Sequence, residues 1–98
     1  MSRVREQDLY RNCRIQMTKE AFKRCIQRKF PMSELRKMVL GGRWCPHVKE
    51  NRRTCVYRDK EKNIYWTIII APRKKYIFII TVYKSNYHEI RMFKKVGK

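Results

Sequence analysis

The chain has 98 residues, of which 43% are hydrophobic, 26 are Lys or Arg and 8 are Asp or Glu, so its formal net charge is +18. This length favours one domain, 1–98, and the hydrophobic content excludes a fully disordered chain. No apolar run approaches the roughly 20 residues of a membrane helix, and the opening MSRVREQDLYRN has no signal-peptide core. We therefore expect a cytoplasmic protein without membrane contact.

The cations are spread along the whole chain and are not confined to a tail. Such an excess opposes compactness through self-repulsion, which suggests that it serves binding to a polyanion. A surface for solubility alone explains it less well, because acidic residues serve that purpose at least equally. We expect a nucleic acid as the partner, RNA ahead of DNA, with an acidic protein as the alternative. The sequence indicates no oligomeric state.

The first residues, 1–8, are predicted to be a flexible polar arm. Residues 9–17, LYRNCRIQM, alternate weakly between polar and apolar side chains. This alternation predicts a short strand or extended segment.

Residues 18–41 are predicted to form the helical part. Thr18 can cap a first helix, whose acidic first-turn residue Glu20 has the favourable sign for the helix dipole. This helix should end before Pro31, and a second should end at Gly41-Gly42. The apolar face expected for the first helix comprises Ala21, Phe22, Cys25 and Ile26, and that of the second comprises Leu35, Met38, Val39 and Leu40.

The hydrophobic period then changes, and residues 53–83 are predicted to form an antiparallel sheet. Its strands are 53–59, 64–71 and 76–83, rich in β-branched and aromatic residues. Polar loops join them at 59–63 and 72–75, as in a meander. Residues 84–98 are interpreted as an edge strand, 87–94, with a basic tail, and a short helix is the alternative. The expected fold is therefore α+β, with two N-terminal helices packed on a three- to four-stranded antiparallel sheet.

Three stretches, TKEAFKRCIQRKFPMSELRKMVLGG, RRTCVYRDKEKNIYWTIII and IFIITVYKSN, together resemble small uncharacterised domains that look like relatives of the RelE-like toxins. These belong to the barnase, EndoU, colicin and RelE fold group, in which many members are metal-independent ribonucleases. The resemblance covers residues from about 15 to 86. It implies RNA as the target, an endoribonuclease activity of the toxin type, no cofactor, and an acidic antitoxin-like partner.

The chain departs from that pattern at Glu20, where the relatives have His. Metal-free RNA cleavage needs a base, cations for the charged intermediate and an acid for the leaving oxygen. Glu20 could replace the His as base, or activity could have been lost. The candidate catalytic residues are Glu20, Arg24, Thr81, Tyr83 and His88. Each also has an ordinary structural role: an i, i+4 ion pair for Glu20 and Arg24, strand propensity for Thr81, the core rim for Tyr83 and the surface for His88.

Cations beside aromatic residues form the remaining signal, since exposed rings can stack bases while cations follow phosphates. The alternative is that most of these rings belong to the core of a small sheet. The candidate nucleic-acid-binding residues are Lys23, Arg28, Arg43, Arg58, Arg73, Lys74, Lys75 and Lys84.

The four cysteines, Cys13, Cys25, Cys45 and Cys55, contain no Cys-x-x-Cys pair. Cys45, His47 and Cys55 lack the second close pair of structural zinc sites. We therefore expect no metal, buried reduced thiols, and a turn at Trp44-Cys45-Pro46 that packs the helices on the sheet.

Overall fold

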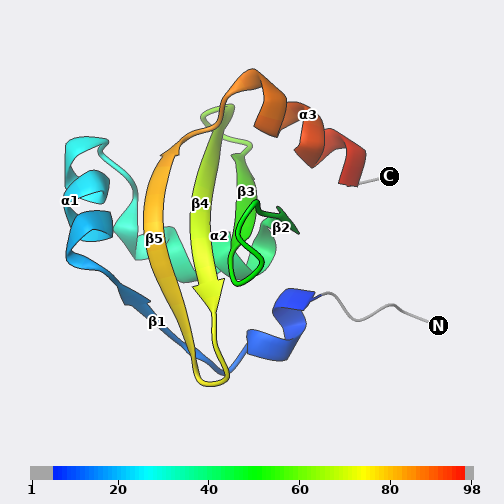
Figure 1. Ribbon diagram of the computed structural model, residues 1–98. Helices are drawn as coiled ribbons and strands as arrows, with labels where there is room; N and C mark the ends of the chain where they lie inside the picture. Colours follow the sequence, from blue (N-terminus) through cyan, green and yellow to red (C-terminus); the bar gives the residue numbers. More distant parts are fainter. Residues whose placement is uncertain (1–5, 97–98) are drawn as a thin grey trace.

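The computed structural model describes residues 6–96, and Figure 1 shows a strongly twisted sheet flanked by helices. Two elements, η1 and η2, are short 3-10 helices. In chain order the elements are η1 (Glu6–Tyr10), β1 (Arg14–Met17), α1 (Lys19–Gln27), η2 (Met32–Glu34), α2 (Leu35–Gly41), β2 (Arg43–Pro46), β3 (Arg53–Asp59), β4 (Ile64–Pro72), β5 (Tyr76–Lys84) and α3 (Tyr87–Val96).

The sheet has five strands in the order β1-β5-β4-β3-β2. The strands β3, β4 and β5 follow one another as an antiparallel meander, at the positions that the sequence predicts. The strand β1 pairs with β5 in parallel, and β2 pairs with β3 antiparallel. The sheet is therefore mixed, with the N-terminal strand at one edge.

The predicted fold class, two N-terminal helices on a three- to four-stranded antiparallel sheet, is wrong. A strand precedes the helices and joins the sheet in parallel, and residues Arg43–Pro46 form a strand where we predicted a turn. The short strand predicted within residues 9–17 is present as β1, although its place in the sheet was not predicted. β2 was missed because it has only four residues, too few for a period of two to stand out. The partner of β1 is also distant in sequence, since Arg14 lies opposite Tyr76.

The predicted edge strand at 87–94 is also wrong, and the alternative, a short helix, is correct, because these residues form α3. A capping box starts this helix. The Asn86 side chain accepts a hydrogen bond from the Glu89 N–H at 2.8 Å, and the Glu89 carboxylate accepts one from the Asn86 N–H at 3.0 Å. Such reciprocal capping satisfies backbone donors that have no partner within the helix.

Both ends of the chain extend beyond the described residues. Of the predicted arm, 1–8, residues 1–5 lie outside that range and 6–8 belong to η1. Of the predicted tail, residues 97 and 98 lie outside it.

The first helix begins as predicted, since the Thr18 hydroxyl accepts a hydrogen bond from the Ala21 N–H at 3.0 Å. Its buried stripe is narrower than predicted. Ala21 and Cys25 are buried, whereas Phe22 and Ile26 are 47% and 61% exposed. α1 packs against β5 and β1 at one edge of the sheet, and its buried residues are an i, i+4 pair of small side chains.

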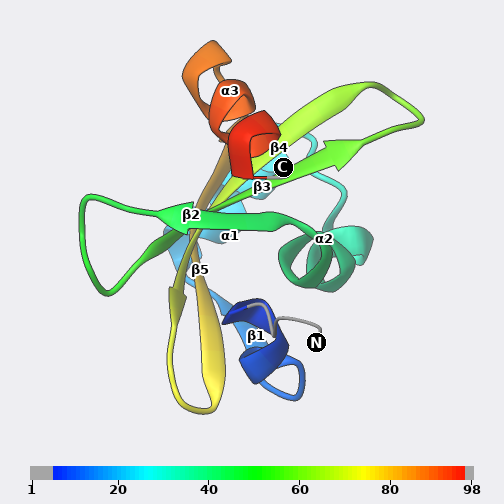
Figure 2. The ribbon, with the colours of Figure 1, turned by 90° about the vertical axis from the view of Figure 1, so that its right-hand side faces the viewer.

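One hydrophobic core lies between α1, α2 and the sheet. Phe30, in the link between the helices, contacts Trp66 of β4 edge-on, with ring centroids 5.0 Å apart. Figure 2 shows α2 on one side of the sheet and the β2–β3 loop on the other. The core side chains of the sheet are Cys55, Trp66, Ile68, Ile70, Ile77, Ile79 and Val82.

Candidate nucleic-acid interface

The face of the sheet opposite α1 and α2, which we call the open face, is covered less completely. α3 lies over its upper end in Figure 1, and the β2–β3 loop, residues 47–52, projects in front of it. Along β5 a strip remains half-buried. We define the β5 strip as the open-face side chains Tyr76, Phe78, Thr81 and Tyr83.

A β-bulge determines which side chains belong to the β5 strip. Ile79 pairs with Ile70, but the next pair is Thr81 with Ile69, so Ile80 is an extra residue. Without it, Thr81 would share the core face with Ile79, because side chains alternate along a strand. The bulge therefore brings Thr81 to the same face as Phe78, and bulges commonly re-aim side chains in this way.

The lower end of the β5 strip carries two aromatic rings. Tyr76 and Phe78 are half-buried, with ring centroids 6.0 Å apart and ring planes inclined by 38°. Their neighbours across the parallel ladder are Arg14 and Gln16 of β1, in register with Tyr76 and Phe78 respectively. Both β1 side chains are exposed. A cation and an amide thus stand beside two partly exposed rings.

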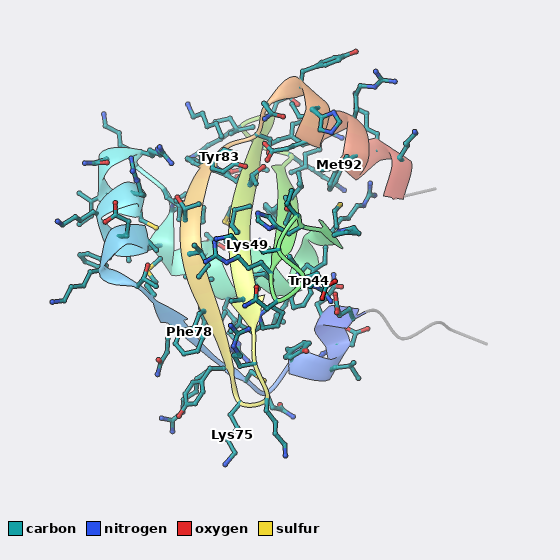
Figure 3. All side chains as sticks on the ribbon, viewed as in Figure 1. Trp44, Lys49, Lys75, Phe78, Tyr83 and Met92 are labelled. Carbon is teal, nitrogen blue, oxygen red and sulfur yellow. The ribbon has the colours of Figure 1, made fainter. Side chains whose placement is uncertain are left out.

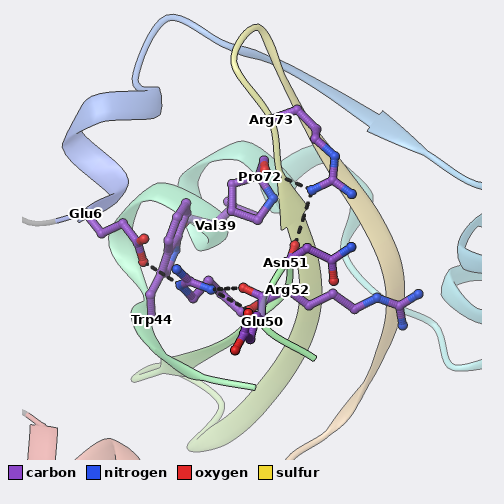
Figure 4. A network of polar contacts seen from close by, with 9 residues as sticks. Glu6, Val39, Trp44, Glu50, Asn51, Arg52, Pro72 and Arg73 are labelled. Carbon is purple, nitrogen blue, oxygen red and sulfur yellow. Dashed lines mark hydrogen bonds and ion pairs between the residues drawn. The ribbon is translucent and has the colours of Figure 1, made fainter. Parts of the chain in front are cut away.

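The β2–β3 loop places cations in front of the β5 strip. Figure 3 shows Lys49 in front of β4 and β5, and Figure 4 shows Arg52 directed toward β5. Arg73, in the β4–β5 turn, donates hydrogen bonds to the carbonyl oxygens of Asn51 and Pro72 at 3.2 and 3.1 Å. These bonds hold the loop against the turn, which continues with exposed Lys74 and Lys75.

Arg28, at the C-terminal end of α1, borders the upper part of the β5 strip. Its guanidinium donates a hydrogen bond to the carbonyl oxygen of Val82. Its charge also lowers the pKa of Tyr83, against larger effects that raise it. Arg28 therefore lies beside the part of β5 that carries Tyr83.

Tyr83 is already engaged with α3. Its hydroxyl donates to the carboxylate of Glu89, a buried side chain that is 7% exposed. Burial, together with the hydrogen bond and the charge of Glu89, raises the pKa of Tyr83. The phenol therefore stays neutral at physiological pH. The phenol oxygen can accept a hydrogen bond from a ligand, but the hydroxyl proton is already donated to the Glu89 carboxylate.

The other candidate catalytic residues lie elsewhere. Glu20 and Arg24 form an ion pair with each other on α1, at 3.6 Å, with the Glu20 side chain 68% exposed. His88 is exposed on the first turn of α3. Among residues 6–96, no hydrogen bond or ion pair joins Glu20 or His88 to Thr81 or Tyr83. The candidates therefore fall into separate places: Thr81 and Tyr83 lie on the open face of β5, Glu20 and Arg24 on α1, and His88 on α3.

The candidate nucleic-acid-binding residues divide in the same way. Arg28, Arg73, Lys74 and Lys75 border the β5 strip. Arg43 stacks on Phe93 with its guanidinium carbon 3.9 Å from the ring centroid, and it donates to the Phe93 carbonyl, so it fastens α3 to β2. Arg58 stands over Tyr65 at 5.8 Å. Lys23 and Lys84 are exposed on α1 and at the end of β5.

A groove of about 920 Å³ between α2, the β3–β4 turn and Phe93 is the alternative location. It contains several lysines and arginines but also three carboxylates, those of Glu34, Asp59 and Glu61. Glu34 lies 3.8 Å from Lys37, and Asp59 accepts two backbone hydrogen bonds of the turn. These carboxylates offset the positive potential, so the open face suits a polyanion better.

The sequence-based candidates did not include several residues of the open face, among them Arg14, Gln16, Lys49, Arg52 and Phe78. Gln16 and Phe78 become neighbours only through the parallel pairing of β1 and β5. Lys49 and Arg52 are brought to β5 by a loop that follows an unpredicted strand. Their residue types, cationic, amide and aromatic, are visible in the sequence as possible nucleic-acid contacts. Their position on the open face is not visible there.

Cys45, His47 and Cys55 are not gathered as a set of metal ligands in the described part of the chain. Cys45 and Cys55 are buried on neighbouring strands, and burial raises the pKa of both thiols, which disfavours the thiolate that a metal needs. His47 accepts a hydrogen bond from the Lys49 N–H at 3.0 Å. Within residues 6–96, no group of three or more His, Cys, Asp or Glu side chains is arranged to hold a metal.

No described helix combines the length and apolar character needed to cross a membrane. Comparison with known protein families, with curated proteins and with solved structures finds no match to this chain.

Proposed function

We propose that this protein binds RNA along the open face of its sheet. The observation that carries the proposal is the half-buried β5 strip of aromatic and hydroxyl side chains, bordered by cations from four separate segments. These segments are β1, the end of α1, the β2–β3 loop and the β4–β5 turn. Aromatic rings flanked by cations are the surface that single-stranded nucleic acids require.

The charges at the border of the β5 strip are available to an external anion. Within the described residues, the ion pairs join Arg11 to Asp8, Arg24 to Glu20, Lys37 to Glu34 and Arg53 to Glu6. None of these pairs uses a cation that borders the strip. The net charge of +18 adds a long-range attraction for a polyanion.

The resemblance to RelE-like toxins supports RNA ahead of DNA as the polyanion. Binding without cleavage is the better-supported form of the proposal. The candidate base, Glu20, is paired with Arg24 at an exposed position, and the Tyr83 proton is held by Glu89. Among residues 6–96, no acid and base face each other across the β5 strip, as cleavage of a phosphodiester would need.

A pair of double variants tests the location of binding. Lys74→Gln with Lys75→Gln removes two lysines from the β4–β5 turn, and Lys60→Gln with Lys62→Gln removes two from the β3–β4 turn, at the opposite end of β4. Fluorescence anisotropy with a labelled RNA would give the binding constant at several salt concentrations. The first variant should reduce the slope of the logarithm of the binding constant against the logarithm of the salt concentration. The expected reduction is about 1.4, or roughly 0.7 for each lost phosphate contact. The second double variant should have the same slope as the wild type.

Equal losses in both double variants would overturn the assignment to the open face. RNA incubated with the protein in EDTA should remain intact. Cleavage that yields 2′,3′-cyclic phosphate ends and disappears in Tyr83→Phe would instead establish a ribonuclease.

A further inference from the structure

The rings of Tyr76 and Phe78 lie on the part of the open face that is farthest from α3. Phe78 lies opposite Ala71 of β4 in the sheet, and Ala71 is 3% exposed. The cross-strand neighbour of Phe78 is thus a small buried residue, and Phe78 itself is half-buried. Figure 3 shows Phe78 at the lower edge of the sheet, above Lys75.

Each ring has a polar neighbour on the adjacent strand. β1 runs parallel to β5 with Arg14 opposite Tyr76 and Gln16 opposite Phe78, at the usual strand spacing of about 4.8 Å. The two β1 side chains are exposed. A glutamine amide both donates and accepts hydrogen bonds, as the edge of an unpaired base does. An arginine pairs readily with phosphate.

From this arrangement we propose that the open face binds unpaired RNA, with bases stacked on Phe78 and Tyr76 and the Gln16 amide at the edge of the base on Phe78. The inference rests on the proposed RNA binding and specifies its substrate class. The ring centroids are 6.0 Å apart, whereas neighbouring bases in a duplex strand are about 3.4 Å apart. Two bases on these rings must therefore be separated from each other, which a paired strand does not allow.

A duplex would not use the two rings. Double-stranded RNA is recognised mainly through phosphates and 2′-hydroxyls across its minor groove. Its base faces are not accessible to side chains, so the two rings would make no contact with a duplex. Duplex RNA would contact only the cations that border the β5 strip.

The test compares a labelled 12-nucleotide RNA without self-complementarity with the same strand annealed to its complement. Phe78→Leu removes the aromatic face and keeps an apolar side chain. It should weaken binding of the single strand about tenfold and leave duplex binding unchanged. Tyr87→Leu is the matched control, because Tyr87 is 75% exposed on α3, and it should bind both RNAs like the wild type.

Gln16→Ala provides a second variant that cannot unfold the core, because Gln16 is exposed. It should weaken binding of the single strand a few-fold without changing the duplex. If the wild type binds both RNAs equally, or Phe78→Leu and Gln16→Ala bind the single strand like the wild type, this inference is wrong and the proposed RNA binding stands. If neither RNA binds at low salt, both fail.

Discussion

Tyr83, near the end of β5, donates a hydrogen bond to Glu89 on the first turn of α3. The second oxygen of the same carboxylate accepts the Asn86 N–H at 3.0 Å. One buried acidic side chain therefore caps α3 and fastens it to the sheet. This contact fixes the upper end of the open face.

Tyr83→Phe should reduce the free energy of unfolding by about 2 kcal/mol, because it removes a hydrogen bond to a buried charged acceptor. Urea denaturation followed by circular dichroism would measure the change. Tyr87→Phe is the matched control, since Tyr87 is exposed on the same helix, and its effect should lie within about 0.5 kcal/mol. Equal stabilities of the two variants would contradict the role of the Tyr83 hydroxyl.

The same contact predicts a stability difference at alkaline pH. Burial and Glu89 raise the pKa of Tyr83 above the ordinary value of about 10. The neutral phenol therefore contributes stability that is fully present below about pH 10 and is lost as the pH rises through the raised pKa of the folded state. Above about pH 10 the wild type should lose stability more steeply than Tyr83→Phe. Parallel pH profiles from urea denaturation would argue against this coupling.

The sequence contained the signal for α3, although the hydrophobic pattern concealed it. Residues 87–94 alternate well enough to suggest a strand, but Asn86 and Glu89 have the spacing of a capping box. The capping box therefore predicted the structure of this segment better than a period of two over a few residues did. The reverse occurred at α1, where the period predicted burial of Phe22 and Ile26, yet the helix lies at a sheet edge too narrow to cover them.

The three long strands were predictable because their β-branched runs exceed what a turn or short helix would carry. The composition of the candidate interface was predictable only in part. Thr81 and Tyr83 were among the candidate catalytic residues, but the bulge that places Thr81 on the same face as Phe78 depends on the pairing with Ile69. The register between β4 and β5 follows from packing of the whole sheet, so it cannot be predicted from the local sequence.

Gly42→Ala tests the close approach of α2 to β3. An added Cβ at Gly42 would lie 2.6 Å from the sulfur of Cys55 and 2.8 Å from the carbonyl oxygen of Met38. We expect a loss of about 1–3 kcal/mol in the free energy of unfolding from overpacking. At neighbouring Gly41 the nearest atom is 3.8 Å away, in Tyr57. Gly41→Ala should therefore be neutral or stabilising in this helical position, and thermal denaturation of both variants would show the contrast.

Thr18→Ala tests the cap of α1. The hydroxyl oxygen accepts the Ala21 N–H at 3.0 Å and donates to the Ile79 carbonyl at 3.4 Å. Its removal should cost about 1 kcal/mol, measured as a shift of the urea midpoint. Thr18→Ser keeps the hydroxyl and should retain most of that stability. A serine variant as unstable as the alanine variant would show that the methyl group, and not the cap, is responsible.

Lys29→Gly should stabilise the protein. α1 ends in a Schellman motif, in which the Phe30 N–H donates to Cys25 at 2.9 Å and the Lys29 N–H donates to Ile26 at 3.3 Å. Lys29 has a φ of 53°, a left-handed conformation that costs a residue with a Cβ about 1–2 kcal/mol. Glycine removes this strain but raises the entropy of the unfolded chain, so the expected net gain is about 0.5–1 kcal/mol.

The control for that variant is Lys23→Gly, within α1, which should instead destabilise by about 1 kcal/mol. Each variant replaces one exposed lysine, so both lose the same charge and only the backbone conformation distinguishes them. A loss of stability in Lys29→Gly would mean that the lysine side chain contributes more than its conformation costs. Because Arg28 immediately precedes this residue and bonds to β5, RNA binding by Lys29→Gly would also report whether the geometry of this turn sets the border of the β5 strip.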